Sequence, residues 1–377
     1  MYSLNDYNYS LPEELIAQAP ASPRDESRLM VLERNRQKVS HCRFADIARL
    51  LSPGDLLVVN NTCVVPARLI GSKETGGKVE VLLLSYAGQT ITPAQTIPPV
   101  RSCLSVAGGR QQVENSESMG SFRCECLVKT SKRPRIGSKF HFDADLQAVV
   151  LGRTNGVCML EFRFKGDFDR LLDRIGRIPL PPYIKRDQTK PPPCDDRACY
   201  QTVYAEKKGA VAAPTAGIHF SKELLGVLEK KGVEIVPITL HVGYGSFLPV
   251  RALDVREHRI HPEIYDLTPE AAGTINKAKD EGRRIIAVGT TTVRVLEFAS
   301  DPSGRVRAGS GECDLFIYTG FEFGVIDAFI TNFHLPKTTL LMLVAAFAGR
   351  DFILNAYQEA IRLRYRFYSY GDAMLIL

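Results

Sequence analysis

The amino-acid sequence predicts an α/β fold in which both ends of the chain build one mixed-sheet domain and an antiparallel β-barrel domain is inserted between them. Strand-like and helix-like segments alternate near the start and again from residue 210 onward. Between them lie short alternating segments with almost no helical periodicity. We therefore expect a discontinuous α/β domain, residues 1–65 and 161–377, and an inserted barrel, residues 66–160.

The composition is typical of a folded globular protein with a mild excess of positive charge. The 377 residues suffice for about two domains, and 45% hydrophobic with 24% charged residues exclude wholesale disorder. Lys and Arg number 48 against 42 acidic residues, a net charge of +6. This charge suits a polyanionic partner without requiring one.

The sequence shows no signal for export or membrane insertion. The first residues lack the basic start and apolar core of a secretory signal. The apolar stretch 338–349 is shorter than the roughly 20 residues that cross a bilayer. The nine cysteines form no C-x-x-C pair, which argues against a zinc ribbon, and without a secretory signal we expect them to be reduced thiols. We expect a cytoplasmic protein with no membrane contact.

The elements of the first α/β part follow from apolar runs and their terminators. Residues 11–20 predict a short amphipathic helix closed by Pro20, and residues 28–32 predict a strand. A helix over 44–55 ends at a Ser-Pro-Gly sequence, and the apolar run 56–62 predicts a buried strand. The chain therefore opens as a compact α/β segment.

The middle of the chain has the pattern of an antiparallel β domain. We expect its strands at 78–86, 123–130, 139–151 and 156–164. The stretch 87–120, rich in Gly, Gln, Ser, Thr and Pro, predicts a long loop, and the proline-rich stretch 178–197 predicts an extended segment. The α/β pattern then resumes. We expect helices at 221–232, 269–282, 290–300, 338–349 and 352–364. We expect strands at 233–240, 283–289, 314–320 and 327–336.

Four polar segments follow apolar runs of the α/β part. They are residues 213–220, 241–247, 288–294 and 331–339. Ligands of α/β proteins collect at the carboxyl ends of the strands. Five of the seven histidines lie between His219 and His334, and three of those five fall in these segments. We expect the functional site there.

The segment VGTTTVR favours an anion site at the start of a helix. It places Gly289 after a strand and Thr290, Thr291 and Thr292 in the first helical turn, where free N–H groups and hydroxyls attract negative charge. Arg294 would add a guanidinium. An ordinary threonine cap is an equally good interpretation of this motif alone.

Three further segments carry candidate residues. TNFHLPKTT places Asn332, His334 and Lys337 ahead of a helix, and HVGYGSF has glycines at 243 and 245 that permit close backbone approach or a tight turn. His219 in APTAGIHF has two interpretations, a general base or a structural residue.

The run HRIHPE has a spacing that argues against a metal site. It contains His258, His261 and Glu263, but Pro262 prevents the two histidines from sharing a helix face. No H-E-x-x-H motif accompanies it. We expect no metal.

Together these segments resemble one family, the S-adenosylmethionine:tRNA ribosyltransferase-isomerases of queuosine synthesis. The resemblance rests on IAQAPASPRDESRLMVL, GDLLVVNNTCVVPARL, GAVAAPTAGIHF, HVGYGSFLPV, VGTTTVRVLE, TNFHLPKTTLLMLVAAFAG and YRFYSYGDAMLI. It implies an enzyme that transfers and isomerises the ribosyl unit of S-adenosylmethionine onto 7-aminomethyl-7-deazaguanine at the tRNA wobble position. Epoxyqueuosine-tRNA, adenine and methionine would be its products.

The resemblance also implies roles for residues of this chain. Proton transfer would fall to His219 and His241, and next to His261 and Glu263. S-adenosylmethionine would be bound by Thr215, Gly243, Gly245, Thr290, Thr291, Thr292, Arg294, Asn332, His334 and Lys337. The nucleoside or tRNA would be contacted by Arg24, Arg28, Asn60, Arg68, Lys132, Arg133, Tyr370 and Asp372. We expect a monomer whose barrel grips the anticodon arm near Lys132.

Three other functions compete with this interpretation. An RNA methyltransferase would show a glycine-rich loop after its first strand, and none is present. A metal-dependent hydrolase would use His258, His261 and Glu263. A non-catalytic RNA-binding protein would not need histidine-bearing turns at several strand ends.

Overall fold

The structure is a computed structural model with two compact units. It describes residues 2–84, 119–187, 189–247 and 250–377. The units are Met1–Val64 with Leu180–Leu377, and Val65–Pro179. The second unit runs past residue 160, where the sequence suggested a boundary, because a strand and a helix of this unit follow. The predicted loop 87–120 lies outside the described residues except for Met119 and Gly120, which begin strand β7.

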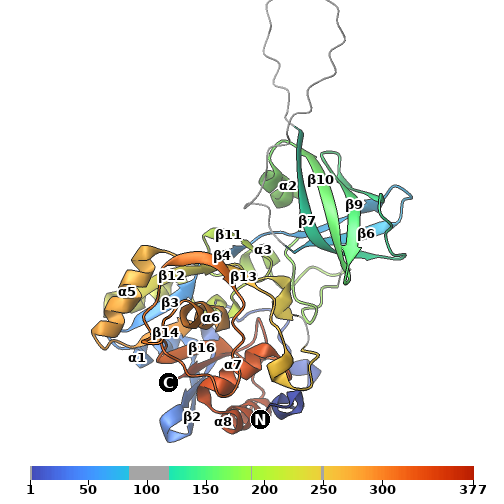
Figure 1. Ribbon diagram of the computed structural model, residues 1–377. Coiled ribbons are helices and arrows are strands. Elements are labelled where there is room, and N and C mark those ends of the chain that lie inside the picture. Colours follow the sequence, from blue (N-terminus) through green and yellow to red (C-terminus); the bar gives the residue numbers. More distant parts are fainter. Residues whose placement is uncertain (1, 85–118, 188, 248–249) are drawn as a thin grey trace, which may run out of the picture. The chain divides into compact units, whose positions relative to one another are not determined.

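The first unit is built on a mixed nine-stranded sheet (Figure 1). In spatial order its strands are β15 (Gly309–Cys313), β13 (Glu263–Leu267), β12 (Glu234–Leu240), β3 (Leu56–Asn60), β14 (Ile285–Val288), β16 (Ala328–Asn332), β17 (Ala373–Ile376), β1 (Arg28–Glu33) and β2 (Lys38–Arg43). Strands β12, β3, β14 and β16 are parallel neighbours, whereas β17 is antiparallel to β16 and parallel to β1. The predicted α/β sheet made from both ends of the chain is confirmed.

Alternate residues of the sheet face two separate cores. In β3, Leu56 and Val58 pack into one core and Leu57 and Val59 into the other. The first core is covered by α5 (Pro269–Asp280), α6 (Thr290–Phe298), α7 (Thr339–Ala348) and α8 (Arg350–Arg362). The second is covered by α1 (Ile47–Leu50) and α4 (Lys222–Lys231). Burial on both faces explains why these strands are continuous apolar runs.

Two predicted elements of this unit are wrong. Residues 11–20 form only a short 3-10 turn, Glu13–Leu15, because the prolines at 12 and 20 leave too few residues for an α-helix. Residues 314–320 form no strand. The Leu315 carbonyl instead accepts a hydrogen bond from the Arg294 guanidinium.

A short parallel pair completes the strands of the first unit. Its members are β4 (Thr62–Val64) and β11 (Lys207–Ala210). The short helix α3 (Asp196–Cys199), which follows the proline-rich segment, precedes β11 in the chain. Within the described residues, no single helix is long and apolar enough to cross a membrane. Helices α7 and α8 are long and apolar enough only when taken together, and the chain bends by 114° between them.

The second unit contains a closed antiparallel barrel, as predicted. Its strands in order are β10 (Val157–Lys165), β7 (Met119–Thr130), β6 (Lys78–Leu83), β5 (Arg68–Lys73), β8 (Lys139–Asp143) and β9 (Leu146–Thr154). Inward residues alternate with outward ones along β10. The stacked rings of Phe122 and Phe162 lie inside, and Phe168 of helix α2 (Phe168–Ile175) packs on them.

Candidate functional site

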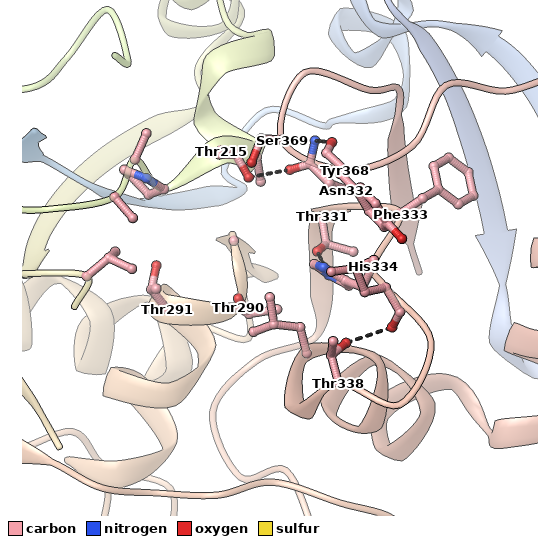
Figure 2. A pocket seen from close by; sticks show the side chains of 18 of the residues that line it. Thr215, Thr290, Thr291, Thr331, Asn332, Phe333, His334, Thr338, Tyr368 and Ser369 are labelled. Carbon is pink, nitrogen blue, oxygen red and sulfur yellow. Dashed lines mark hydrogen bonds between the residues drawn. The ribbon is translucent and has the colours of Figure 1, made fainter. Parts of the chain in front are cut away.

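A cavity of about 350 Å³ lies at the carboxyl ends of β14 and β16 in the first unit. It is lined by residues 182–183, 200, 212–216, 242, 250, 289–291, 294, 331–338, 340 and 368–369. Three of the four polar strand-end segments therefore meet here, and the fourth contributes only Val242. Figure 2 shows Thr215 and Ser369 on one side of this cavity and Thr338 on the opposite side.

Asn332, the last residue of β16, connects the cavity wall to the core. Its amide nitrogen donates to the Tyr368 carbonyl at 3.2 Å and lies 3.0 Å from Nε2 of His219. Its amide oxygen accepts a hydrogen bond from the Thr215 hydroxyl at 3.0 Å. Because the Tyr368 carbonyl can only accept, the amide group is oriented with its nitrogen toward His219, whose Nε2 must then be the unprotonated ring nitrogen.

His219 lies behind Asn332 and does not line the cavity. Its Nδ1 is 2.7 Å from the Ser27 hydroxyl, and its ring stacks on Phe44 with centroids 5.1 Å apart. Burial lowers the pKa of His219 to about 4, although the Asp372 carboxylate acts in the opposite direction. The ring is thus neutral at pH 7, and both of its nitrogens are already hydrogen-bonded.

His334 is the one histidine among the described residues that line the cavity. Its Nε2 lies 2.7 Å from the Thr331 hydroxyl, while its Nδ1 has no hydrogen-bond partner among the described residues. Its backbone N–H donates to the Tyr357 hydroxyl at 3.0 Å. Burial lowers the pKa of His334 to about 3, so its ring is neutral at pH 7.

Lys337 provides positive charge at the cavity. Its backbone has φ of 60° and its N–H donates to the Tyr7 carbonyl at 2.9 Å, which fixes the turn before α7. Its half-buried side chain has no ion-pair partner among the described residues. Thr338 caps α7 by accepting from the Leu341 N–H at 3.3 Å. An ammonium group and a helix N-terminus together form an anion-binding arrangement.

Arg294 also lines the cavity, but its donors are used inside the protein. It forms a buried ion pair with Glu263 at 2.5 Å and donates to the carbonyls of Leu315 and Cys313 at 2.9 and 3.0 Å. Glu263 in turn accepts the Gly243 N–H at 2.9 Å. The pair therefore ties α6 to β13 and to the turn after β12.

The three threonines of α6 have different surroundings. Thr290 and Thr291 line the cavity, whereas the Thr292 hydroxyl donates to the carbonyl of Val288, the last residue of β14, at 2.7 Å. Thr291 accepts a hydrogen bond from the fully buried Asn60 amide at 3.2 Å. Asn60 also donates to the Leu240 carbonyl, which makes it a support for Thr291.

A family model described as "Queuosine biosynthesis protein" matches residues 4–376. The chain belongs to this queuosine biosynthesis family. It is 50% identical over 375 residues to the S-adenosylmethionine:tRNA ribosyltransferase-isomerase of Syntrophotalea carbinolica and 48% identical over 375 residues to that of Carboxydothermus hydrogenoformans, with 99% of each chain covered. The family resemblance inferred from the sequence is confirmed.

A solved structure is also similar over its full length. The crystal structure of an S-adenosylmethionine tRNA ribosyltransferase from Thermotoga maritima is 37% identical, with a TM-score of 0.52 over 99% of this chain and 100% of that chain. At this identity the similarity extends beyond the fold alone.

In this member of the queuosine biosynthesis family, the other histidines expected to transfer protons also lie away from the cavity. His241 is half-buried, with Nδ1 2.8 Å from the Thr62 hydroxyl. Burial lowers the pKa of His241, and the Asp266 carboxylate opposes this shift. His261 is exposed and packs against Gly245. Of the four residues expected to transfer protons, none lines the cavity.

Several residues expected to contact the nucleoside or tRNA form contacts inside the first unit. Arg24 donates to the carbonyls of Gln201 and Ala198. Asp372, 1% exposed, forms ion pairs with Arg28 at 3.0 Å and Arg366 at 3.5 Å. The rings of Tyr370 and Tyr200 contact edge to face at 5.8 Å.

Three further candidates belong to the second unit. Arg68 is paired with Glu80 at 2.8 Å. Lys132 and Arg133 are exposed in the turn between β7 and β8 and have no ion-pair partner among the described residues. These two cations are therefore available to a polyanion.

The cavity residues that the sequence analysis missed include Tyr183, Tyr200 and Ser369. Tyr183 lies in the proline-rich stretch 178–197, and Ser369 lies in the motif YRFYSYGDAMLI next to the candidate Tyr370. For these two residues, their place in these segments was the available signal. In the parts of the chain that the structure describes, no group of three His, Cys, Asp or Glu residues is arranged to hold a metal ion.

Proposed function

We propose that this chain transfers and isomerises the ribosyl unit of S-adenosylmethionine onto 7-aminomethyl-7-deazaguanine at the wobble position of tRNA. Epoxyqueuosine-tRNA would form, and adenine and methionine would be released. The observation that carries this proposal is the similarity to S-adenosylmethionine:tRNA ribosyltransferase-isomerases over 99% of the chain. The cavity adds support, since its volume of about 350 Å³ is in the usual range for small-molecule sites.

Lys337 is the residue we assign to the carboxylate of the methionine moiety. Carboxylate binding needs a cation with free donors. Arg294, the other cation at the cavity, is already paired with Glu263. Lys337 and the N-terminus of α7 are free to take this role, and Thr290 and Thr291 also line the cavity.

His334 is the residue we assign to proton transfer at the substrate. The reaction requires removal of a proton from the ribosyl carbon beside the sulfonium. The adjacent sulfonium acidifies that C–H group, and the buried His334 imidazole is in the neutral form that can accept a proton. The unpartnered Nδ1 of His334 is the atom that would accept it.

His219 is then a positioning residue. It does not line the cavity, but its Nε2 accepts a hydrogen bond from the Asn332 amide nitrogen. The Asn332 amide oxygen in turn accepts a hydrogen bond from the Thr215 hydroxyl. The neutral form of His219 is required for this arrangement, and burial stabilises that form. The role depends on geometry and not on a change of protonation state.

tRNA binding is assigned to the barrel unit, through Lys132 and Arg133. Exposed unpaired cations bind a phosphate backbone and release its counterions, so the KM for tRNA should rise with salt concentration. The reaction as proposed uses no metal, and its substrates place it in the cytoplasm. A monomeric enzyme is part of the proposal, and light scattering measures it directly.

The test is to incubate the protein with S-adenosylmethionine and tRNA that carries 7-aminomethyl-7-deazaguanine. Adenine and methionine should be released, with a ribosyl-derived mass gain on the modified nucleoside. S-adenosylhomocysteine with a methyl mass gain would identify a methyltransferase and overturn the proposal. Binding of tRNA without any product would overturn it in favour of a binding protein.

A further inference from the structure

One side of the cavity carries several hydroxyl groups with no role in the steps above. Three of them, from Tyr183, Tyr200 and Ser369, are here called the hydroxyl cluster. The Tyr183 and Ser369 oxygens are 2.7 Å apart, and the Tyr200 hydroxyl has no hydrogen-bond partner among the described residues. Three O–H groups therefore form one hydrogen bond between them, and two O–H protons are left without an acceptor.

The Tyr200 hydroxyl is the more unusual of these groups. The residue is fully buried, and burial raises the pKa of the Tyr200 phenol far above its ordinary value. Burial likewise raises the pKa of Tyr183 to about 12. The Ser369 hydroxyl and the Ala213 backbone lie close enough to the Tyr200 phenol to oppose in part the rise of its pKa. Buried hydroxyls without partners are rare in folded proteins, and a ligand acceptor resolves the cost.

The rings around the hydroxyl cluster form a neutral, flat-walled part of the cavity. Tyr183 and Tyr368 pack with centroids 4.8 Å apart. Figure 2 places Ser369 across the cavity from Thr338, which follows Lys337 in the chain. The cavity therefore presents neutral donors and aromatic surface on one side and a cation on the other. A flat heterocycle with unprotonated ring nitrogens suits the first side, and a carboxylate suits the second.

We propose that the hydroxyl cluster binds the adenine base of S-adenosylmethionine, with its two free O–H groups donating to ring nitrogens of the base. This inference rests on the proposed function. It sets the direction of the substrate in the cavity, with adenine at the hydroxyl cluster and the carboxylate at Lys337. Donors at the base also stabilise the negative charge that adenine acquires when its bond to the ribosyl unit breaks.

The test compares two variants against two probes in direct binding measurements without tRNA. Tyr200→Phe should weaken binding of both S-adenosylmethionine and 5′-methylthioadenosine by about 3- to 10-fold, because each carries the adenine. Lys337→Gln should weaken only S-adenosylmethionine, because 5′-methylthioadenosine lacks the carboxylate. Ser369→Ala is a second variant of the cluster and should behave like Tyr200→Phe.

Tyr204→Phe is the matched control. Its hydroxyl is also buried and without a partner among the described residues, but Tyr204 does not line the cavity. It should leave binding of both probes unchanged. Because the Tyr200 hydroxyl has no partner in the free protein, Tyr200→Phe should not lower the thermal midpoint, whereas loss of a structural hydroxyl would.

The outcomes separate this inference from the proposed function. Wild-type protein that fails to bind S-adenosylmethionine would overturn the function itself. Wild-type binding that Tyr200→Phe and Ser369→Ala leave unchanged would overturn the assignment of the hydroxyl cluster alone. If Tyr200→Phe and Ser369→Ala raise the KM for tRNA and leave binding of both probes unchanged, the hydroxyl cluster binds the 7-deazaguanine base of tRNA and not adenine.

Discussion

The amide nitrogen of Asn332 lies 3.0 Å from Nε2 of His219, so the Asn332 side chain connects this buried histidine to the cavity. Asn332 lines the cavity and His219 does not. The imidazole therefore acts on the site through the orientation of one carboxamide. That orientation also determines which way the Thr215 hydroxyl donates.

The two buried histidines predict a loss of stability in mild acid. The folded-state pKa values of His219 and His334 are about 4 and about 3, below the ordinary value of 6.5. The unfolded chain therefore binds more protons, so the stabilisation is complete above about pH 6.5 and is lost as the pH falls toward 4. Each histidine should contribute a loss of about 2 kcal/mol in unfolding free energy between pH 7 and pH 5.

Urea denaturation of His219→Gln at the two pH values checks this expectation. The decrease in unfolding free energy between pH 7 and pH 5 should be smaller in the variant than in the wild type by about 2 kcal/mol, whatever the stability of the variant at pH 7. His261→Gln, at an exposed position, serves as control and should keep the full decrease. An unchanged decrease in His219→Gln would show that the His219 ring is protonated as readily in the folded as in the unfolded chain.

The ion pair of Glu263 and Arg294 predicts a large asymmetry between single and double variants. Both side chains are at most 3% exposed. Glu263→Gln leaves a buried guanidinium without its counter-charge and should cost about 3–5 kcal/mol of unfolding free energy. Glu263→Leu combined with Arg294→Met should recover much of that loss, as measured by urea denaturation.

The exposed pair of Arg305 and Asp280 gives the control for this experiment. Its side chains are 50% and 57% exposed, and Asp280→Asn should cost less than about 1 kcal/mol. Glu263→Gln protein with wild-type stability but no turnover would contradict the structural role and restore Glu263 as a proton-transfer residue.

Replacing Lys337 should weaken binding of S-adenosylmethionine, because the proposed partner of Lys337 is the carboxylate of this substrate. Lys337→Gln removes the charge, keeps a polar side chain and leaves the backbone strain at φ of 60° unchanged. The KM for S-adenosylmethionine should rise by about 10-fold or more, since a charged hydrogen bond is lost. Lys337→Arg should restore part of the affinity. Equal effects on S-adenosylmethionine and its decarboxylated analogue would place the carboxylate elsewhere.

Local patterns predicted the buried strands well because burial on both faces leaves a continuous apolar run. Strands β3, β12, β14 and β16 lie where such runs predicted them. The rule that ligands collect at strand ends likewise brought Thr290, Asn332 and Lys337 to one cavity.

Side-chain direction was the part that the sequence did not contain. Nothing local to His219 shows that its ring would stack on Phe44 and bond Ser27, because both partners lie far away in the chain. The same holds for Arg294, whose charge appeared available until β13 placed Glu263 beside it. A motif identifies which residues approach a site, whereas long-range packing decides which atoms face it.

The parallel pairing of β1 with β17 has a consequence for synthesis on the ribosome. The hairpin of β1 and β2 joins the sheet only through β17, and about 330 residues separate Arg43 from Ala373. At roughly 5–20 residues per second the hairpin waits on the order of tens of seconds for its partner. During that time Leu29, Val31 and the other apolar residues of β1 are uncovered, which makes the nascent chain a client for chaperones.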